Sequence, residues 1–158
     1  MDVPLTVLRL QNVYGPGQSL TNSYTGIVSL FSQMARAGQT IPVYEDGGIV
    51  RDFVFIDDVA AAIEAAISIP ASEQCILDIG SGVGTTVWEL AAAIAEIRSA
   101  PVPLVTGQFR DGDVRYAACR VERATKALSW VPRLDLSRGL VALQDWIDAE
   151  MEPLTADS

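Results

Sequence analysis

The sequence predicts an α/β fold, and three observations support this prediction. The chain has 158 residues, of which 49% are hydrophobic, so it fits one domain or a large piece of one with a sizeable core. Short runs rich in β-branched residues alternate with segments whose apolar residues recur at helical spacing. Glycine and proline separate these segments. Alternating strands and helices are typical of α/β architecture.

A strand over Leu5–Gln11 begins the predicted fold. This run of leucine and β-branched residues indicates a largely buried strand, which ends at the turn signal Gly15-Pro16-Gly17. Residues Thr25–Ala37 then place apolar side chains at helical spacing, and Gly38 follows as a C-terminal cap. We therefore expect a strand, a loop and a helix in this order.

Two β-rich segments follow, Ile41–Tyr44 and Ile49–Ile56. The residues between them, Glu-Asp-Gly-Gly at positions 45–48, have the chemistry of a hairpin turn. A helix comes next, and Asp57 or Asp58 is expected to cap its N-terminus.

The second half continues the alternation. Cys75–Ile79 is a short apolar strand that leads into the glycine-rich loop Gly80–Gly84. Thr86 and Glu89 have the spacing of a capping box, which opens a helix to about Arg98. The remaining elements are a strand over Val102–Thr106, a charged loop over Arg110–Asp113, helices over Val121–Ser129 and Ser137–Glu150, and a frayed tail over residues 151–158.

Charge and residue usage exclude several classes of function. Twenty acidic and eleven basic side chains give a net charge of −9, which is the wrong sign for binding nucleic acid or an anionic membrane. The sequence has no histidine, which excludes Ser-His-Asp and Cys-His catalytic sites and histidine-ligated metals. Cys75 and Cys119 have no metal-knuckle spacing and require no disulfide. With no targeting segment or membrane-spanning run evident, we expect a cytoplasmic protein.

The glycine-rich loop has two interpretations. The run CILDIGSGVGT can bring backbone N–H groups to a nucleotide, and taken alone it looks like the first motif of S-adenosylmethionine-dependent methyltransferases. A doubly wound methyltransferase sheet needs further alternating strands, which the remaining chain lacks. The other interpretation is a strand-to-helix turn that binds no ligand.

A few polar residues are candidates for ligand contacts. Arg51 lies inside an apolar strand, where it must either pair with a carboxylate or reach a ligand such as a phosphate. Its neighbour Asp52 could equally pair with a cation. Arg110 and Asp113 could clamp a diphosphate and a ribose or form a solvated turn. Asn12 follows the first strand, where it could contact a ligand or form an Asx-turn with its own backbone.

Four motifs in order give the chain a family resemblance. The segments LRLQNVYGPGQ, IPVYEDGGIVRDFVFIDDVAAAI, LDIGSGVGTTVWELA and FRDGDVR…RATKALSWVP resemble the carboxyl-terminal half of extended short-chain dehydrogenases/reductases. Within that family they are most similar to NAD-dependent nucleotide-sugar epimerases and dehydratases. The resemblance implies a partial Rossmann-type sheet strand followed by a small mixed α/β substrate-binding domain, together spanning residues 1–150.

The resemblance also implies a set of site residues, each carried over from a matching motif. Asn12 would contact the diphosphate-sugar, Arg51 would bind the diphosphate, and Arg110 and Asp113 would hold phosphate and ribose. The base would lie against Val43 and Tyr44, Thr25 would offer a backbone contact, and the main chain around Leu10 and Val13 would lie near the nicotinamide of NAD.

Two departures from the family limit what this chain does alone. Family members use a Tyr-x-x-x-Lys pair for proton transfer, but the sole lysine, Lys126, has Glu122 four positions earlier. The G-x-x-G-x-x-G pyrophosphate loop is also absent from the sequence. We therefore expect a chain without catalytic residues that binds a nucleotide-diphosphate sugar and binds NAD weakly or not at all. The alternative is a non-catalytic interaction or regulatory module that keeps the fold.

The first strand also suggests a partner. In the family, a strand like Leu5–Gln11 lies within the parallel sheet of the Rossmann half, so here its edges and one face would be uncovered. We expect a homo-oligomer or association with the missing Rossmann half.

Overall fold

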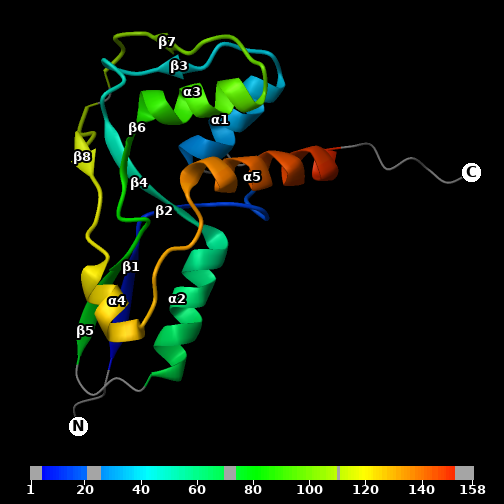
Figure 1. The fold of residues 1–158 in the computed structure, drawn as a ribbon. Helices are drawn as coiled ribbons and strands as arrows, with labels where there is room; N and C mark the ends of the chain where they lie inside the picture. The colour runs from blue at the N-terminus through cyan, green and yellow to red at the C-terminus, as the bar shows by residue number, and fades with distance from the viewer. Residues whose placement is uncertain (1–4, 21–25, 70–73, 110, 152–158) are drawn as a thin grey trace, which may run out of the picture.

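The computed structural model describes residues 5–20, 26–69, 74–109 and 111–151. It confirms the α/β class: parallel strand pairs are flanked by helices (Figure 1). Thr25, Arg110 and the predicted tail beyond residue 151 lie outside the described residues. In the described part, no helix has the length and apolar character needed to cross a membrane.

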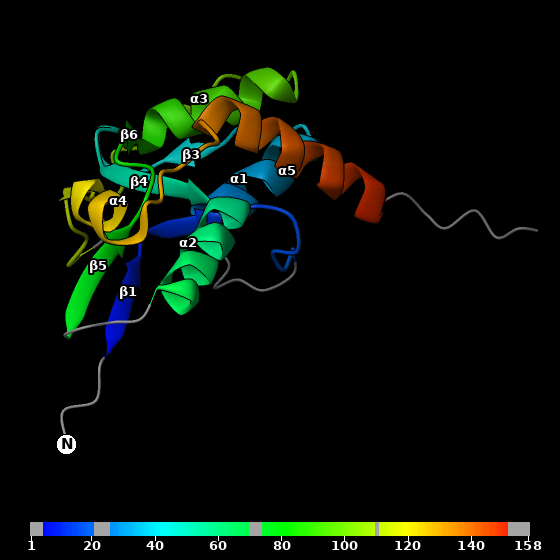
Figure 2. The same ribbon diagram turned by 60° about the horizontal axis from the view of Figure 1, so that its bottom comes forward.

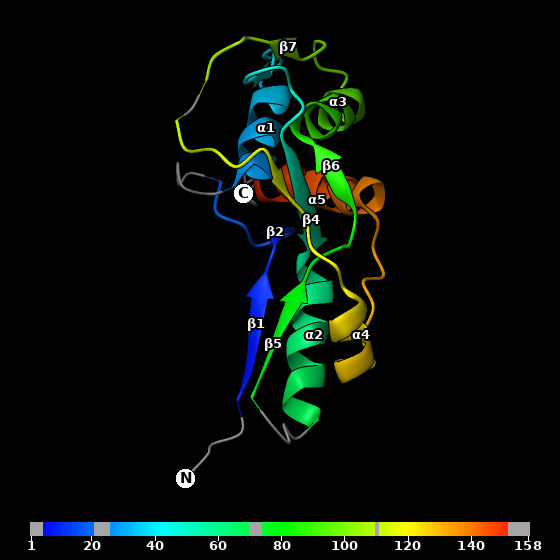
Figure 3. The same ribbon diagram turned by 90° about the vertical axis from the view of Figure 1, so that its left-hand side faces the viewer.

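One layer is built on a two-stranded parallel sheet. Strand β1 (Thr6–Leu10) pairs with β5 (Cys75–Ile79), and the two strands lie side by side in Figure 2. Helices α2 (Ile56–Ser68) and α4 (Glu122–Leu128) lie on one side of this pair (Figure 3). The core between them consists of Val54, Val59, Ala62, Leu77, Ile79, Ala124, Leu128 and Trp130.

The prediction that the first strand is largely buried is wrong. Val7 and Leu10 are 39% and 45% exposed, and Ile76 on the neighbouring strand is 47% exposed. Apolar composition alone indicated burial, but only one face of β1 and β5 is covered by helices. Within the described residues β1 pairs with β5 alone, which leaves its other edge unpaired as the family resemblance implied.

The central sheet is organised around β4 (Val50–Phe55). Its carboxyl-terminal half pairs in parallel with β2 (Asn12–Tyr14). Its amino-terminal half pairs with β6 (Gly84–Thr86) in antiparallel fashion and with β8 (Tyr116–Ala117) in parallel fashion. The three short partner strands were not predicted, because two or three residues carry too little pattern.

The hairpin prediction is also wrong. Residues 45–48 do form a turn, in which the Gly47 N–H donates to the Tyr44 carbonyl at 3.0 Å. However, β3 (Pro42–Val43) pairs in parallel with β7 (Leu104–Val105) instead of with β4. The turn at residues 45–48 was therefore predicted correctly, whereas the pairing of β3 with β4 was not.

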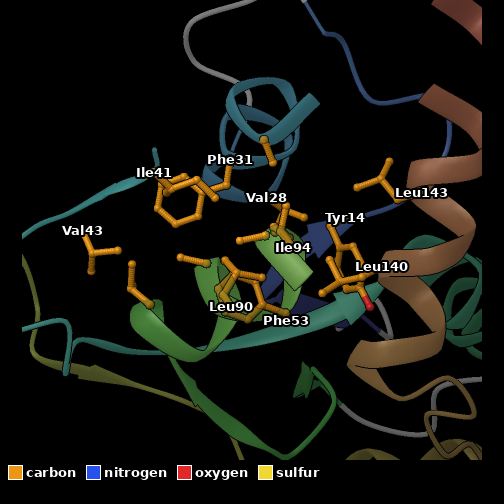
Figure 4. Close-up of a cluster of buried hydrophobic side chains, with 14 of the residues drawn as sticks. Tyr14, Val28, Phe31, Ile41, Val43, Phe53, Leu90, Ile94, Leu140 and Leu143 are labelled. Atoms are coloured by element: carbon orange, nitrogen blue, oxygen red, sulfur yellow. The ribbon is translucent and has the colours of Figure 1, made fainter. Parts of the chain in front are cut away.

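Three helices enclose the main hydrophobic core beside β3 and β4. They are α1 (Ile27–Arg36), α3 (Val87–Ile97) and α5 (Leu136–Met151). Figure 4 shows side chains from these helices meeting Tyr14 and Phe53 from the central sheet. The core also contains Val28, Phe31, Ala35, Ile41, Val43, Ile49, Phe55, Val87, Leu90, Ala91, Ile94, Ala95, Leu140, Leu143 and Ile147.

Two helix-end predictions are confirmed. Thr86 and Glu89 form a capping box at the start of α3, with reciprocal bonds of 3.1 and 2.8 Å. Gly38 follows α1 with a φ of 67°, a left-handed conformation that glycine adopts readily.

The predicted aspartate cap is wrong. The N-cap of α2 is Phe55, and it makes no side-chain cap bond. Asp58 lies in the first turn and accepts the backbone N–H groups of Arg133 and Leu134 at 3.0 and 3.1 Å. An aspartate before an apolar run is typical of a cap, but here tertiary contacts use the carboxylate instead.

Candidate functional site

The side chain of Arg51 is held at the amino-terminal end of β4. Its Nη1 donates to the backbone carbonyls of Val50 and Val114 at 2.8 and 2.6 Å. Its Nη2 donates to Oδ1 of Asp113 at 2.5 Å. The side chain is only 16% exposed. Strand β4 supplies the backbone position, and the segment that leads into β8 supplies most of the acceptors.

This arrangement leaves donors on Arg51 for a ligand. An arginine side chain has five N–H groups, and those three bonds use three of them within the described residues. Nε and the second N–H of Nη2 have no partner among the described residues, and guanidinium N–H groups donate readily to a phosphate or carboxylate. Because the guanidinium is already held in place, binding an anion there costs little side-chain entropy.

Arg51 and Asp113 are thus brought together, as an ion pair. Both interpretations of Arg51 from the sequence are compatible with this geometry, because pairing to one carboxylate leaves donors for an anion. Asp113 keeps its second carboxylate oxygen, which the bond to Arg51 does not use, and its side chain is 32% exposed. A carboxylate oxygen at this position can accept a hydrogen bond from a ligand hydroxyl.

Asn12 lies on β2 beside β4. Its Nδ2 donates to the backbone carbonyl of Asp52 at 3.0 Å, so the amide is tied to the neighbouring strand. Of the two alternatives for Asn12, the Asx-turn is not formed in the described part of the chain, since the amide bonds the neighbouring strand and its oxygen accepts no local backbone N–H there. Asn12 is exposed, and its bond to Asp52 places it next to the strand position of Arg51.

Val43 and Tyr44 occupy different environments at the end of β3. The Val43 side chain is fully buried in the main core, and its carbonyl accepts the Thr106 N–H at 2.9 Å. Tyr44 is 43% exposed and so can present its ring to a ligand. Of these two predicted base contacts, only Tyr44 offers an accessible side chain.

Arg115 links the turn at residues 45–48 to the segment that contains Asp113. Its guanidinium donates to Asp46 at 2.7 and 2.6 Å and to Glu45 at 3.0 Å. These bonds hold the pKa of Asp46 far below its usual value and raise that of Arg115. The backbone carbonyl of Arg115 also accepts the Val50 N–H at 2.9 Å. Sequence reasoning missed this residue, because a pair 69 positions apart leaves no local signal.

The predicted nicotinamide contacts lie on the first two strands. Leu10 ends β1 and is 45% exposed, whereas Val13 on β2 is half-buried against the second core. An open hollow adjoins this region and is lined by Arg9, Gln11, Asp78, Ala118, Cys119 and Arg120. The main chain of Leu10 is therefore close to accessible space at the carboxyl end of β1.

The glycine-rich loop holds a carboxylate of this chain. Asp52 is fully buried, and its Oδ1 accepts the N–H of Ser81 at 2.7 Å, while its Oδ2 accepts the N–H of Gly82 at 3.0 Å. These are the backbone groups that a methyltransferase-like loop would offer to a cofactor. The prediction that Asp52 pairs with a cation is wrong, because its partners in the described part of the chain are backbone, hydroxyl and thiol groups of the Ser81–Gly82 turn and Cys119.

The parallel strands and the flanking helices define an α/β domain whose fold is similar to that of Rossmann-type proteins. The model of the NAD dependent epimerase/dehydratase family matches residues 1–80, just over half of the 158. The chain belongs to this family. The dTDP-L-rhamnose 4-epimerase of Burkholderia thailandensis is 54% identical to it over 149 residues, covering 94% of this chain and 41% of that protein.

Solved structures agree with the family assignment. UDP-glucose 4-epimerase from Thermotoga maritima, determined with UDP-glucose, matches with a TM-score of 0.85 and 34% identity, over 93% of this chain and 47% of that one. UDP-glucose 4-epimerase from Thermus thermophilus, in complex with NAD, matches with a TM-score of 0.76 and 30% identity, over 90% of this chain and 46% of that one. This chain therefore spans less than half the length of these relatives.

Proposed function

We propose that this chain is the nucleotide-diphosphate-sugar-binding part of an NAD-dependent sugar epimerase. The observation that carries the proposal is the fixed guanidinium of Arg51, with two N–H donors that have no partner among the described residues and suit a phosphate. The relatives support a sugar nucleotide as the ligand, because one of them was solved with UDP-glucose. The 54% identity to a dTDP-L-rhamnose 4-epimerase makes a thymidine-diphosphate deoxysugar the first candidate.

Each site residue has a role in this proposal. Arg51 binds the diphosphate, Asp113 accepts a ribose hydroxyl, and the Tyr44 ring lies against the base. Asn12 contacts the sugar-diphosphate from β2. The family resemblance adds Arg110 as a second phosphate contact, Thr25 as a backbone contact and the Val43 main chain beside the base.

NAD enters the proposal as the cofactor of the complete enzyme. When bound, NAD takes up a hydride from a sugar carbon. The residues of this chain fit only the nicotinamide side of such a site, through the main chain near Leu10 and Val13. The sequence has neither a G-x-x-G-x-x-G loop nor a Tyr-x-x-x-Lys pair. We therefore propose that residues 1–150 bind and orient the sugar nucleotide, and that they do not turn it over alone.

The uncovered strand β1 supports a role for a further half. Its unpaired edge offers backbone donors and acceptors to one more strand. We propose that an amino-terminal Rossmann half, in the same polypeptide or a second one, pairs there. A second copy of this chain is the other occupant we expect.

Calorimetric titration with dTDP-L-rhamnose and UDP-glucose tests the proposal, after circular dichroism confirms folding. Arg51→Ala should weaken binding roughly 10- to 100-fold, because hydrogen bonds to charged groups contribute about 1.5–3 kcal/mol. Arg36→Ala is the matched control, since Arg36 forms an ion pair with Asp148 on α5. A folded chain that binds neither nucleotide sugar, or that binds equally well without Arg51, would overturn the proposal.

The interaction-module alternative rests on the same uncovered strand. It predicts a partner on β1 together with no affinity for nucleotide sugars, so the titration above separates the two functions.

A further inference from the structure

Asp52 is a buried carboxylate that makes no ligand contact in the proposed site. Its side chain is fully buried, although a carboxylate is costly to remove from water unless donors surround it. Here the donors are the N–H and Oγ–H of Ser81, both at 2.7 Å from Oδ1, and the N–H of Gly82 at 3.0 Å from Oδ2. Cys119 adds its Sγ at 3.4 Å and its N–H at 3.5 Å.

These contacts join three segments that are distant in the sequence. Asp52 belongs to β4, Ser81 and Gly82 form the turn after β5, and Cys119 lies between β8 and α4. Gly80 approaches closely as well, since a Cβ at that position would lie 2.6 Å from Oδ2 of Asp52. The carboxylate therefore fills its space completely.

Arg51 depends on the same segments. Successive side chains on a strand point to opposite faces, so Asp52 and Arg51 hold β4 from its two sides. Arg51 is paired with Ala117 on β8, and two of its acceptors, Val114 and Asp113, lie just before β8. Cys119, two residues after Ala117, is the point where Asp52 holds this segment.

We infer that Asp52 is a positioning residue for the diphosphate site, because it fixes the β8 segment that carries the acceptors of Arg51. The inference rests on the proposed function. In this inference Asp52, the sequence neighbour of Arg51, supports the site without contacting the ligand.

The donors that surround the Asp52 carboxylate make this inference testable with a single substitution. In the described part of the chain, the hydrogen-bond partners of the Asp52 oxygens are all donors, including the Cys119 thiol, whose pKa burial raises to about 12 so that it stays protonated. In Asp52→Asn the amide NH₂ replaces one acceptor oxygen and faces other donors. The size of the side chain is nearly unchanged, so the variant tests the charge and acceptor capacity of the carboxylate rather than its packing.

The matched control is Asp58→Asn. Asp58 is also buried and also accepts two backbone N–H groups, but they belong to Arg133 and Leu134, outside the proposed site. Both variants should lower the unfolding midpoint. Only Asp52→Asn should weaken binding of dTDP-L-rhamnose or UDP-glucose, by about tenfold, because displacing a positioned contact by a fraction of an ångström is costly.

A double-mutant cycle separates positioning from general destabilisation. If Asp52 acts through Arg51, then Asp52→Asn should change the affinity of Arg51→Ala by less than about twofold, whereas independent effects would multiply. If Asp52→Asn fails to fold, Ser81→Ala keeps the backbone N–H donor to Asp52, removes the Oγ–H donor together with the Oγ contacts to Val83, and should still weaken binding measurably.

The outcomes are distinct. Equal losses of affinity in Asp52→Asn and Asp58→Asn, or a full effect in the Arg51→Ala background, would overturn the inference alone. Lack of binding by the folded wild-type chain would overturn the proposed function, and this inference with it.

Discussion

Arg9 and Asp78 face each other across β1 and β5 and form a two-point ion pair. Nε and Nη2 of Arg9 lie 2.7 and 2.8 Å from the two carboxylate oxygens of Asp78. The Arg9 side chain is 63% exposed, so the pair contributes little to stability. It lies on the uncovered face of the sheet, together with the apolar side chains of Val7 and Ile76.

This face predicts self-association of the isolated chain. Val7→Lys should shift the chain towards monomer, because a charge on the uncovered strand opposes pairing. Size-exclusion chromatography with light scattering over a range of concentrations measures this. Ile67→Lys is the control, since Ile67 is 80% exposed on α2. A wild-type chain that is monomeric at high concentration would contradict the prediction.

The Cys119 thiol predicts a loss of stability at alkaline pH. Burial and the nearby Asp52 raise its pKa from 9.0 to about 12 in the folded chain. The folded state therefore holds this proton more tightly than the unfolded state, and the resulting stability is lost as the pH rises from about 9 to 12. Urea unfolding of wild type and Cys119→Ser at several pH values measures the difference. The serine keeps a donor but does not titrate, so parallel pH profiles would contradict the assignment.

We predict that replacing Gly139 on α5 by alanine destabilises the fold, although alanine usually stabilises a helix. Alanine normally stabilises a helix relative to glycine by about 1 kcal/mol. A Cβ at Gly139 would collide with the Tyr14 hydroxyl and lie 3.0 Å from Phe55. Gly139→Ala should therefore destabilise the chain by about 1–3 kcal/mol.

Urea unfolding measures this loss. Tyr14→Phe in the same chain removes the colliding hydroxyl and should restore part of the stability. No recovery in the double variant would show that the cost has another origin.

We predict that replacing Gln144 lowers the stability of the fold markedly, because its buried amide joins two helices. It is buried on α5, accepts from Nε of Arg98 at 2.8 Å and donates to Oγ of Ser32 on α1 at 2.8 Å. Gln144→Leu removes both of these bonds, so unfolding should become easier by about 1–3 kcal/mol. Arg36→Ala, at an exposed ion pair on the same helices, should change the midpoint little. Equal effects of the two changes in urea unfolding would contradict this reasoning.

The helices and most strands, including the two-residue β3 and β7, could be predicted from the sequence, whereas β2, β6 and β8 could not. The helices and the strands β1, β4 and β5 repeat their apolar pattern often enough to be recognised. Strands β2, β6 and β8 exist because β4 offers them hydrogen bonds, and that reason is not local. The same limit explains the wrong hairpin, since β3 finds its partner in β7.

The candidate site divides in a similar way. Arg51 could be selected because a lone arginine in an apolar strand needs a partner, Asn12 because it follows a strand, and Asp113 because it lies in a charged loop. The family motifs then gave these candidates their roles. The partners themselves could not be predicted, because Arg51 and Asp113 are 62 positions apart. Asp52 and Arg115 hold the site in place, yet each acts through contacts that exist only after the chain has folded.

The three partners of β4 also constrain the order in which the site forms. Strand β8 is the last of these three partners along the chain, and the segment just before it fixes Arg51. Contacts between positions so far apart close late, because the loop between them must first lose its conformational freedom. During synthesis, the residues up to 80 that carry the family signature would leave the ribosome with the arginine still unfixed. The site that we propose for a sugar nucleotide is therefore complete only after Ala117 has emerged from the ribosome.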